Sequence, residues 1–242
     1  GGSWSPNTTN GNLLVAVLAH QGNPGTYTPP TNWTQIGSTI NNGATYISFW
    51  YIENAASQST TQTWTFTNSV LSALVIAEYS GVLASGALDQ NTTNNGNSSS
   101  PSTGTISPSD TNALGIGGLA ITIDSFSSIS FSLPTNSYTI AHQVTSSIMD
   151  LPSHYCAVAL LEKIGSLGAS TSTGATASAS SNWGGVIASF LPEGASSASV
   201  THTTNALLKA LNTSKTHTTN ALLTLEGLNK THTTNALLKA LS

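Results

Sequence analysis

The sequence predicts an all-β protein, an antiparallel and jelly-roll-like β-sandwich followed by a short C-terminal extension of 15-residue repeats. About ten apolar or alternating runs of strand length recur between residues 11 and 191, separated by Gly, Pro and Asn, and the region contains no convincing helical periodicity. The extension follows from the octapeptide THTTNALL, which begins at residues 201, 216 and 231. We therefore divide the chain into a β-sandwich body (1–192), a linker (193–200) and three repeats (201–242).

The first half of the body contains runs rich in aliphatic, β-branched and aromatic residues, which favour strands. Asn12–His20 is apolar throughout, as is typical of a strand that is covered on both faces. The residues Asn41-Asn42-Gly43 predict a hairpin turn, since Asn and Gly tolerate positive φ. The predicted strands in this half are Asn12–His20, Trp33–Ile40, Ala44–Glu53, Gln62–Thr67 and Leu71–Tyr79.

The second half opens with a polar segment, residues 89–110, whose only hydrophobic anchor is Ile106. We expect a long loop there: a binding loop, an exposed lid or a disordered excursion. Strands 128–133 and 138–144 are expected to pair around a turn at Pro134–Asn136. The predicted strands in this half are Ala113–Ile123, Ser128–Leu133, Tyr138–Val144, Ser153–Ile164, Ala175–Ser180 and Trp183–Leu191.

Charge is scarce and unevenly distributed. Only 6% of the residues are charged, and the chain contains no arginine. Residues 1–192 hold one lysine against seven acidic residues, a net charge of −6, whereas the remainder holds four lysines against two glutamates, a net charge of +2. The body therefore lacks the clustered cations that bind a phosphate backbone, which argues against nucleic acid as a partner. A surface of Ser, Thr and Asn is typical of exported proteins and rigid assemblies, so we expect an extracellular, cell-surface or virion location.

Other compositional signals are weaker. No apolar run is long enough to span a membrane. The single cysteine, Cys156, lies in an apolar run and reads as a buried thiol. Glycosylation sequons occur at Asn7, Asn32, Asn91, Asn97, Asn212 and Asn229, which is compatible with export, although a chain this rich in Asn, Ser and Thr contains such matches by chance.

Four segments carry a resemblance: GNLLVAV at 11–17, Trp33-Thr34, YISFWYIENA at 46–55 and ALVIAEYSGV at 73–82. Together they resemble β-sandwich modules of bacterial secreted proteins and phage structural proteins. The THTTNALL repeats likewise resemble tails of surface or virion proteins. These resemblances imply location and carry no catalytic residue. Such modules begin with one more strand ahead of the segment that matches Asn12–His20, so we expect the body to lack a strand and to leave one sheet edge open.

The repeats combine two tendencies. Asn-Ala-Leu-Leu-Lys-Ala-Leu is composed of strong helix formers, with Thr204 as an N-cap, whereas Thr-His-Thr-Thr favours an extended strand. In either conformation each repeat exposes leucines that need a partner, supplied by the body, a neighbouring copy or a bundle of tails. A flexible stalk is the alternative. The assembly candidates are Leu207, Leu208, Leu211, Leu222, Leu223, Leu225, Leu237 and Leu238.

Candidate chemistry is sparse, and each signal has a simpler structural interpretation. The chain has no Gly-x-Ser-x-Gly nucleophile motif. Glu53 and Glu78 could form a carboxylate pair, but strand-end hydrogen bonding is the simpler interpretation. Oxygen ligands at Asp89, Asn91, Asp110 and Asn112 could hold calcium, although their spacing lacks the regularity of a calcium loop.

Histidines and tryptophans complete the candidates. One histidine recurs in each repeat: His202, His217 and His232. They could bind a metal or sense pH, but the simpler interpretation is that each ring hydrogen-bonds to neighbouring threonines of its repeat. His20, His142 and His154 lie within predicted strands and read as structural. The five tryptophans could form a sugar-stacking platform, but aromatic residues more often fill sandwich cores.

These observations predict a structural protein without enzymatic activity or a cofactor. It would assemble with copies of itself as a filament, fibre or decoration subunit. A neighbour's residues 1–10 or tail would complete the open edge by strand addition. The alternative is a carbohydrate-binding or adhesive module on a stalk, with the 89–110 loop and exposed Trp33 and Trp50 as its site.

Overall fold

The computed structural model describes residues 2–3, 8–56, 58, 61–124, 128–148 and 154–194. The chain divides into two units, Gly1–Gly194 and Ala195–Ser242, and the second lies wholly outside the described residues. The predicted repeats, their leucines and their histidines are therefore outside the description, as are Asn7, Asn212 and Asn229.

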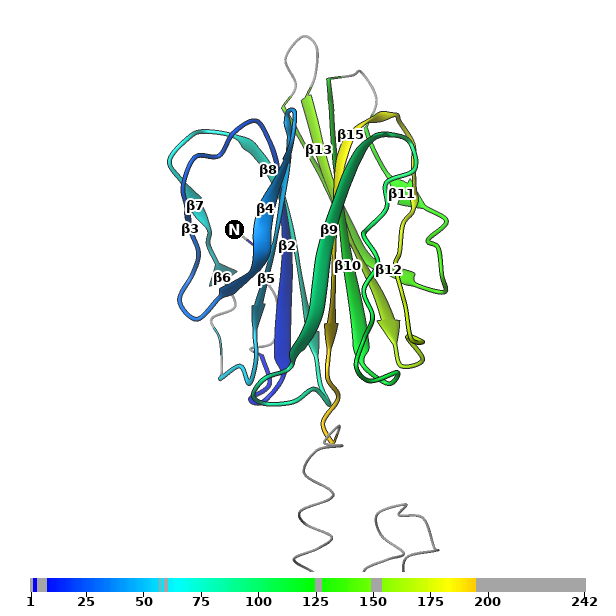
Figure 1. Cartoon of the computed structure of the whole chain (residues 1–242). Coiled ribbons are helices and arrows are strands. Elements are labelled where there is room, and N and C mark those ends of the chain that lie inside the picture. Colours follow the sequence, from blue (N-terminus) through cyan, green and yellow to red (C-terminus); the bar gives the residue numbers. More distant parts are fainter. Residues whose placement is uncertain are drawn as a thin grey trace, which may run out of the picture. The chain divides into compact units, whose positions relative to one another are not determined.

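The described body confirms the antiparallel β-sandwich (Figure 1). One sheet has the strand order β4-β5-β2-β8 and the other β12-β13-β10-β15-β9. The bounds of the first sheet are β2 (Leu13–Gln21), β4 (Thr34–Asn42), β5 (Thr45–Ile52) and β8 (Leu71–Tyr79). Those of the second are β9 (Leu88–Ser98), β10 (Leu114–Asp124), β12 (Thr139–Ile148), β13 (His154–Ile164) and β15 (Ser181–Phe190).

Both faces of each sheet are covered, which explains the continuous apolar runs in the sequence. Along β2, Leu13, Val15 and Val17 face a central core between the sheets, whereas Leu14 and Leu18 face an outer layer. The prediction that Asn12–His20 forms a strand covered on both faces is confirmed, since side chains alternate between the two faces of a strand.

Short strand pairs form the outer layers, at the flanks of the sandwich in Figure 1. On the four-stranded sheet the cover is the pair β3 (Tyr27–Thr28) and β7 (Thr65–Phe66), with Trp33 and Trp64 beneath it. On the five-stranded sheet the cover contains the pair β11 (Phe131–Ser132) and β14 (Thr176–Ala177). Two further short strands, β1 (Gly2–Ser3) and β6 (Thr61–Gln62), pair with each other.

The two sheets are built to one plan. Numbered along the chain, the strands β2, β4, β5 and β8 have the spatial order second-third-first-fourth, and β10, β12, β13 and β15 have the same order. In each half one short strand after the first long strand pairs with one before the last: β3 with β7, and β11 with β14. Each half also has a bulge between its second and third long strands. The body is therefore an internal repeat, to which the second half adds β9.

The sequence supports this repeat at the last strand of each half. Val75-Ile76-Ala77-Glu78-Tyr79 in β8 corresponds to Val186-Ile187-Ala188-Ser189-Phe190 in β15. The pairing agrees, because Tyr79 lies opposite Leu13 at the start of β2 and Phe190 lies opposite Leu114 at the start of β10. The two layers of the predicted sandwich are confirmed. The jelly-roll-like connections are not, because a jelly roll is built from Greek keys and the strand order within each half differs from the 4-1-2-3 order of a Greek key.

The largest correction concerns residues 89–110. The predicted loop is wrong for its first half, because Leu88–Ser98 forms the eleven-residue strand β9 and pairs antiparallel with β15. Its polar sequence is compatible with an edge strand, whose side chains meet solvent on much of their surface.

Two smaller predictions are also corrected. Segments 128–133 and 138–144 do not pair as a hairpin, since β11 pairs with β14 and β12 pairs with β13. The predicted strand Gln62–Thr67 is interrupted and contributes β6 and β7 to different strand pairs, although Trp64 and Phe66 share one outer cluster as expected.

Candidate functional site

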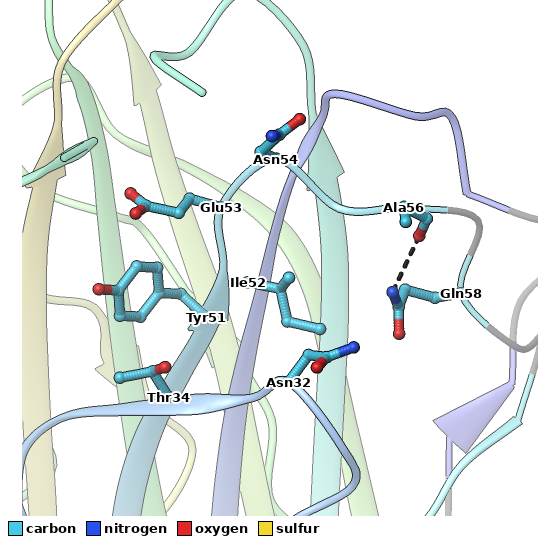
Figure 2. A pocket seen from close by; sticks show the side chains of 8 residues that line it. All are labelled: Asn32, Thr34, Tyr51, Ile52, Glu53, Asn54, Ala56 and Gln58. Atoms are coloured by element: carbon cyan, nitrogen blue, oxygen red, sulfur yellow. Dashed lines mark hydrogen bonds between the residues drawn. The ribbon is translucent and has the colours of Figure 1, made fainter. Parts of the chain in front are cut away.

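A hollow of about 340 Å³ lies at the end of β5 (Figure 2). It is lined by Asn32, Thr34, Tyr51, Ile52, Glu53, Asn54, Ala56 and Gln58. Strand alternation at the end of β5 sends Tyr51 and Glu53 to one side of the strand and Ile52 to the other, where Asn32 and Gln58 lie. A volume near this size suits a small ligand.

Hydrogen bonds and ring packing hold three of these side chains in place. The Glu53 carboxylate accepts a hydrogen bond from the Ala87 backbone N–H at 2.9 Å. The Tyr51 ring packs against Phe190, with 6.0 Å between ring centroids. Burial raises the pKa of Tyr51, and the nearby negative charge of Glu53 raises it further, so the phenol stays protonated and can donate a hydrogen bond. Gln58 donates to the Ala56 carbonyl at 2.9 Å, the one hydrogen bond drawn in Figure 2.

Two asparagines complete the hollow with unusual backbone geometry. Asn32 and Asn54 have φ values of 74° and 49°, in the left-handed region that Asn tolerates better than most residues. Carboxamides both donate and accept hydrogen bonds, and the lining has one carboxylate and no cation. The hollow is therefore suited to a neutral, hydrogen-bonding ligand, and it lacks a second carboxylate for acid–base catalysis.

Of the two interpretations of the tryptophans, the core interpretation is confirmed for the four that the structure describes, and they form no exposed sugar-stacking platform. Trp33, Trp50, Trp64 and Trp183 are all buried. Trp33 Nε1 donates to Gln62 at 2.8 Å and Trp50 Nε1 donates to Ser48 at 2.8 Å, so both indoles are held inside the outer layer. Trp4 lies outside the described residues.

The two candidate glutamates have separate structural partners. Glu78 accepts hydrogen bonds from the Thr9 N–H and the Asn12 carboxamide, both at 2.7 Å. Glu53 is bonded to Ala87 as described above. The simpler strand-end interpretation of these residues is confirmed, and they form no carboxylate pair.

The two aspartates among the candidate calcium ligands accept hydrogen bonds within the body. Asp89 accepts from the Ser109 N–H and hydroxyl and from the buried Ser189 hydroxyl. Burial alone would raise the pKa of Asp89, but these hydrogen bonds outweigh it and lower the pKa. Asp110 accepts from the Asn112 N–H at 2.7 Å. Within the described ranges no group of three or more His, Cys, Asp or Glu residues is placed to hold a metal ion.

The body's histidines and its cysteine have structural surroundings. His20 is fully buried beside Tyr27 and Phe66, and burial lowers its pKa to about 4. His154 hydrogen-bonds to Asp124, and His142 is an exposed residue of β12. Cys156 is buried as predicted, and burial raises the pKa of its thiol to about 12.

Three predicted sequons fall on described residues. Asn32 is exposed and lines the hollow, while Asn91 and Asn97 lie on β9. Tyr51, Asn54 and Gln58 were not expected as site residues; the only sequence signal was a polar Glu53-Asn54 step directly after an aromatic strand.

Comparison of the chain with protein-family models, curated proteins and solved structures finds no match. The resemblance to secreted and phage modules therefore stays a prediction. In the part of the chain that the structure describes, no helix is long and apolar enough to cross a membrane.

Proposed function

We propose that this protein is a non-enzymatic structural subunit of an extracellular or virion surface. It associates with copies of itself as a filament, fibre or decoration subunit.

The surface chemistry carries this proposal. Lys163 is the one lysine or arginine among the described residues, and its ammonium group donates to the Asn136 carbonyl at 3.2 Å. Amides and hydroxyls supply most of the remaining polar contacts, as where Asn97 donates to Asn182 and Asn42 donates to Gly96. Such a surface can pack against a copy of itself without the large cost of removing ions from water.

Open sheet edges supply a route to association. In the described body each main sheet ends in strands that have one hydrogen-bonded neighbour: β4 and β8 in one sheet, β12 and β9 in the other. Unpaired strand edges are templates for strand addition. Of the two expected donors, the N-terminal segment is already engaged in part, since Gly2–Ser3 pairs with β6 in the same body. The repeat tail is the remaining donor.

The test is electron microscopy with analytical sizing of the whole chain and of a version that ends at Pro192. We expect the whole chain to form regular filaments or closed oligomers and the shortened chain to remain monomeric. Monodisperse monomers of both chains would rule the proposal out.

The hollow favours a second candidate function, a carbohydrate-binding or adhesive module. The site that the sequence predicts for this function is not formed, because Trp33 and Trp50 are buried and Leu88–Ser98 is a strand. The hollow instead offers carboxamides, a phenol, a hydroxyl and one carboxylate around a volume of about 340 Å³. Neutral saccharides present hydroxyl groups that such side chains can bind.

Saturation-transfer NMR with maltose, cellobiose and N,N′-diacetylchitobiose tests this candidate. The double variant N32G/N54G removes both carboxamides and leaves positive φ permitted, so it should fold and lose any binding of about 1 mM. The matched control is Ser166→Gly, at another residue with positive φ (53°) outside the hollow. Equal saturation transfer to a sugar from the unchanged protein, the double variant and the Ser166→Gly control would exclude the hollow as the site.

A further inference from the structure

The internal repeat identifies one strand position that no described residue of the first half fills. In the second half, β15 pairs with β10 on one side and with β9 on the other. In the first half, the equivalent strand β8 pairs with β2 and has no hydrogen-bonded strand on its other side among the described residues. Among the described residues, no strand occupies the position beside β8 that corresponds to β9.

The effect of β9 is seen by comparing the exposure of residues in β15 with that of the equivalent residues in β8. Ile187, Ala188 and Phe190 in β15 are each 0% exposed. Their counterparts in β8, Ile76, Ala77 and Tyr79, are only half-buried, although the local sequences are nearly the same. The difference follows from the neighbour, since β15 lies inside its sheet and β8 is at the edge.

Strand β12, which lies beside β8 but belongs to the other sheet, also has an apolar side chain left exposed at this position. Its residue Val144 lies opposite Val158, a residue of the central core, yet Val144 is 41% exposed. The seam between β12 and β8 is closed in part by the Ser146 hydroxyl, which donates to the Ser72 carbonyl at 2.6 Å. In the equivalent place of the other half, β9 lies against β4, where Asn42 donates to the Gly96 carbonyl.

We propose that the free edge of β8 accepts an extended strand from the repeat tail of a second copy, residues 201–208 (THTTNALL). This proposal rests on the proposed self-association and assigns its acceptor surface. The donated strand occupies the place of β9 in the repeat and runs antiparallel to β8, as β9 does to β15.

Three features favour the tail as the occupant. The alternative donor at the N-terminus is partly engaged, because Gly2–Ser3 pairs with β6. The charges are complementary, since residues 1–192 carry −6 and the segment from Glu193 onward carries +2, with Glu78 exposed on β8 itself and Lys209 next to the first THTTNALL. An extended THTTNALL segment would also place Leu207 and Leu208 on opposite faces of the donated strand, so each face would gain one apolar side chain.

The number of donors favours a second copy over the same chain. Each chain carries three THTTNALL segments and one open β8 edge. At most one of these segments can occupy the β8 edge of its own chain, so at least two remain available to the β8 edges of neighbouring copies. A head-to-tail contact of this kind propagates into a filament if it does not close.

Hydrogen–deuterium exchange of the full-length chain tests the proposal, at concentrations below and above assembly. We expect those amides of Leu71–Tyr79 that face away from β2 to exchange at least about tenfold more slowly in the assembled state than in the dilute monomer. The full-length variant T203P/T218P/T233P removes backbone donors from all three segments and should lose both the assembly and the protection. The matched variant T203A/T218A/T233A keeps those donors and should retain both.

The outcomes separate this proposal from the proposed function. Assembly without protection of β8 would overturn the acceptor and leave self-association standing. Protection of β8 in the dilute monomer would show that the chain's own segment fills the edge, and would overturn the second copy as donor. Absence of both assembly and protection would overturn both proposals.

Discussion

The hydroxyl of Tyr79 donates a hydrogen bond to the Glu162 carboxylate across the sandwich, with 2.6 Å between the oxygens. The internal repeat places Phe190 and Tyr51 in the equivalent positions, and there the two rings pack with their centroids 6.0 Å apart. One cross-sheet position is thus filled by a charge-assisted hydrogen bond in one half and by an aromatic contact in the other. Burial, followed by the bond to Glu162 and its charge, raises the pKa of Tyr79.

Tyr79→Phe should therefore remove one hydrogen bond and leave the ring in place. We expect a loss of about 1–2 kcal/mol in the free energy of unfolding, because bonds to charged groups exceed neutral ones and this one is partly exposed. Urea unfolding measures it. In a double-mutant cycle with Glu162→Ala, which removes the acceptor, the double variant should lose less stability than the sum of the two single losses, and additive effects would show that the two groups do not interact.

His20 should make the body less stable in acid. Its pKa is lowered by burial to about 4 from the ordinary 6.5, so the folded state disfavours the protonated ring. The stability that His20 contributes is fully present above pH 6.5 and is lost as the pH falls toward 4, amounting to about 3 kcal/mol. Urea unfolding at pH 7 and at pH 4 measures the loss.

His20→Phe is the control for that experiment, because it fills the site beside Tyr27 and Phe66 with an untitratable ring. The carboxylates lose stability in acid in both proteins, so the difference between the two isolates His20. An equal loss in both proteins would remove His20 as the cause.

Asn42 ties β4 to the opposite sheet. Its side-chain amide donates to the Gly96 carbonyl at 2.7 Å and to the Trp183 carbonyl at 3.0 Å. Asn42→Asp places a carboxylate against two carbonyl oxygens, and should cost about 2–3 kcal/mol of unfolding free energy. Thermal or urea unfolding measures the loss, and Asn41→Asp, an exposed neighbour, should change stability little.

Gly118 lies where the two sheets pack closely against each other. A Cβ at this position would lie 2.7 Å from Val17 Cγ1 and 2.8 Å from Val186 Cγ2. Gly118→Ala should therefore destabilise the body by about 1–3 kcal/mol through overpacking of the central core. Adding Val17→Ala makes room, so the double variant should be more stable than the sum of the two single changes predicts. Simple additivity would argue against a steric conflict.

The candidate site was largely hidden from the sequence. Glu53 was identified, but as a strand-end group, and Asn32 only as a sequon. The hollow unites Asn32, which precedes β4, with Asn54 and Gln58, which follow β5, and this proximity arises only when β4 and β5 pair. Trp33 and Trp50 were misplaced as exposed candidates because composition does not show that a second layer, β3 with β7, covers that face of the sheet.

The sequence by itself determined those elements whose stability is local or whose two faces are both apolar. Leu71–Tyr79 has the predicted bounds, and Asn12–His20 differs from β2 by one residue at each end, because continuous apolar runs must be buried on both sides. The THTTNALL repeat and the unequal division of charge also follow from the sequence alone. Even the internal repeat had a signal, in VIAEY and VIASF placed 111 residues apart (75 and 186).

The tertiary structure alone decided which polar segment became a strand and which edge stayed open. Leu88–Ser98 has no apolar pattern, and it is extended because its backbone pairs with Ser181–Phe190, which lies far along the chain. A backbone ladder depends on the partner strand and hardly on the side chains at a sheet edge, so no local pattern predicts it. For the same reason the similar ends of β8 and β15, VIAEY and VIASF, differ in burial: β15 has two neighbouring strands and β8 has one.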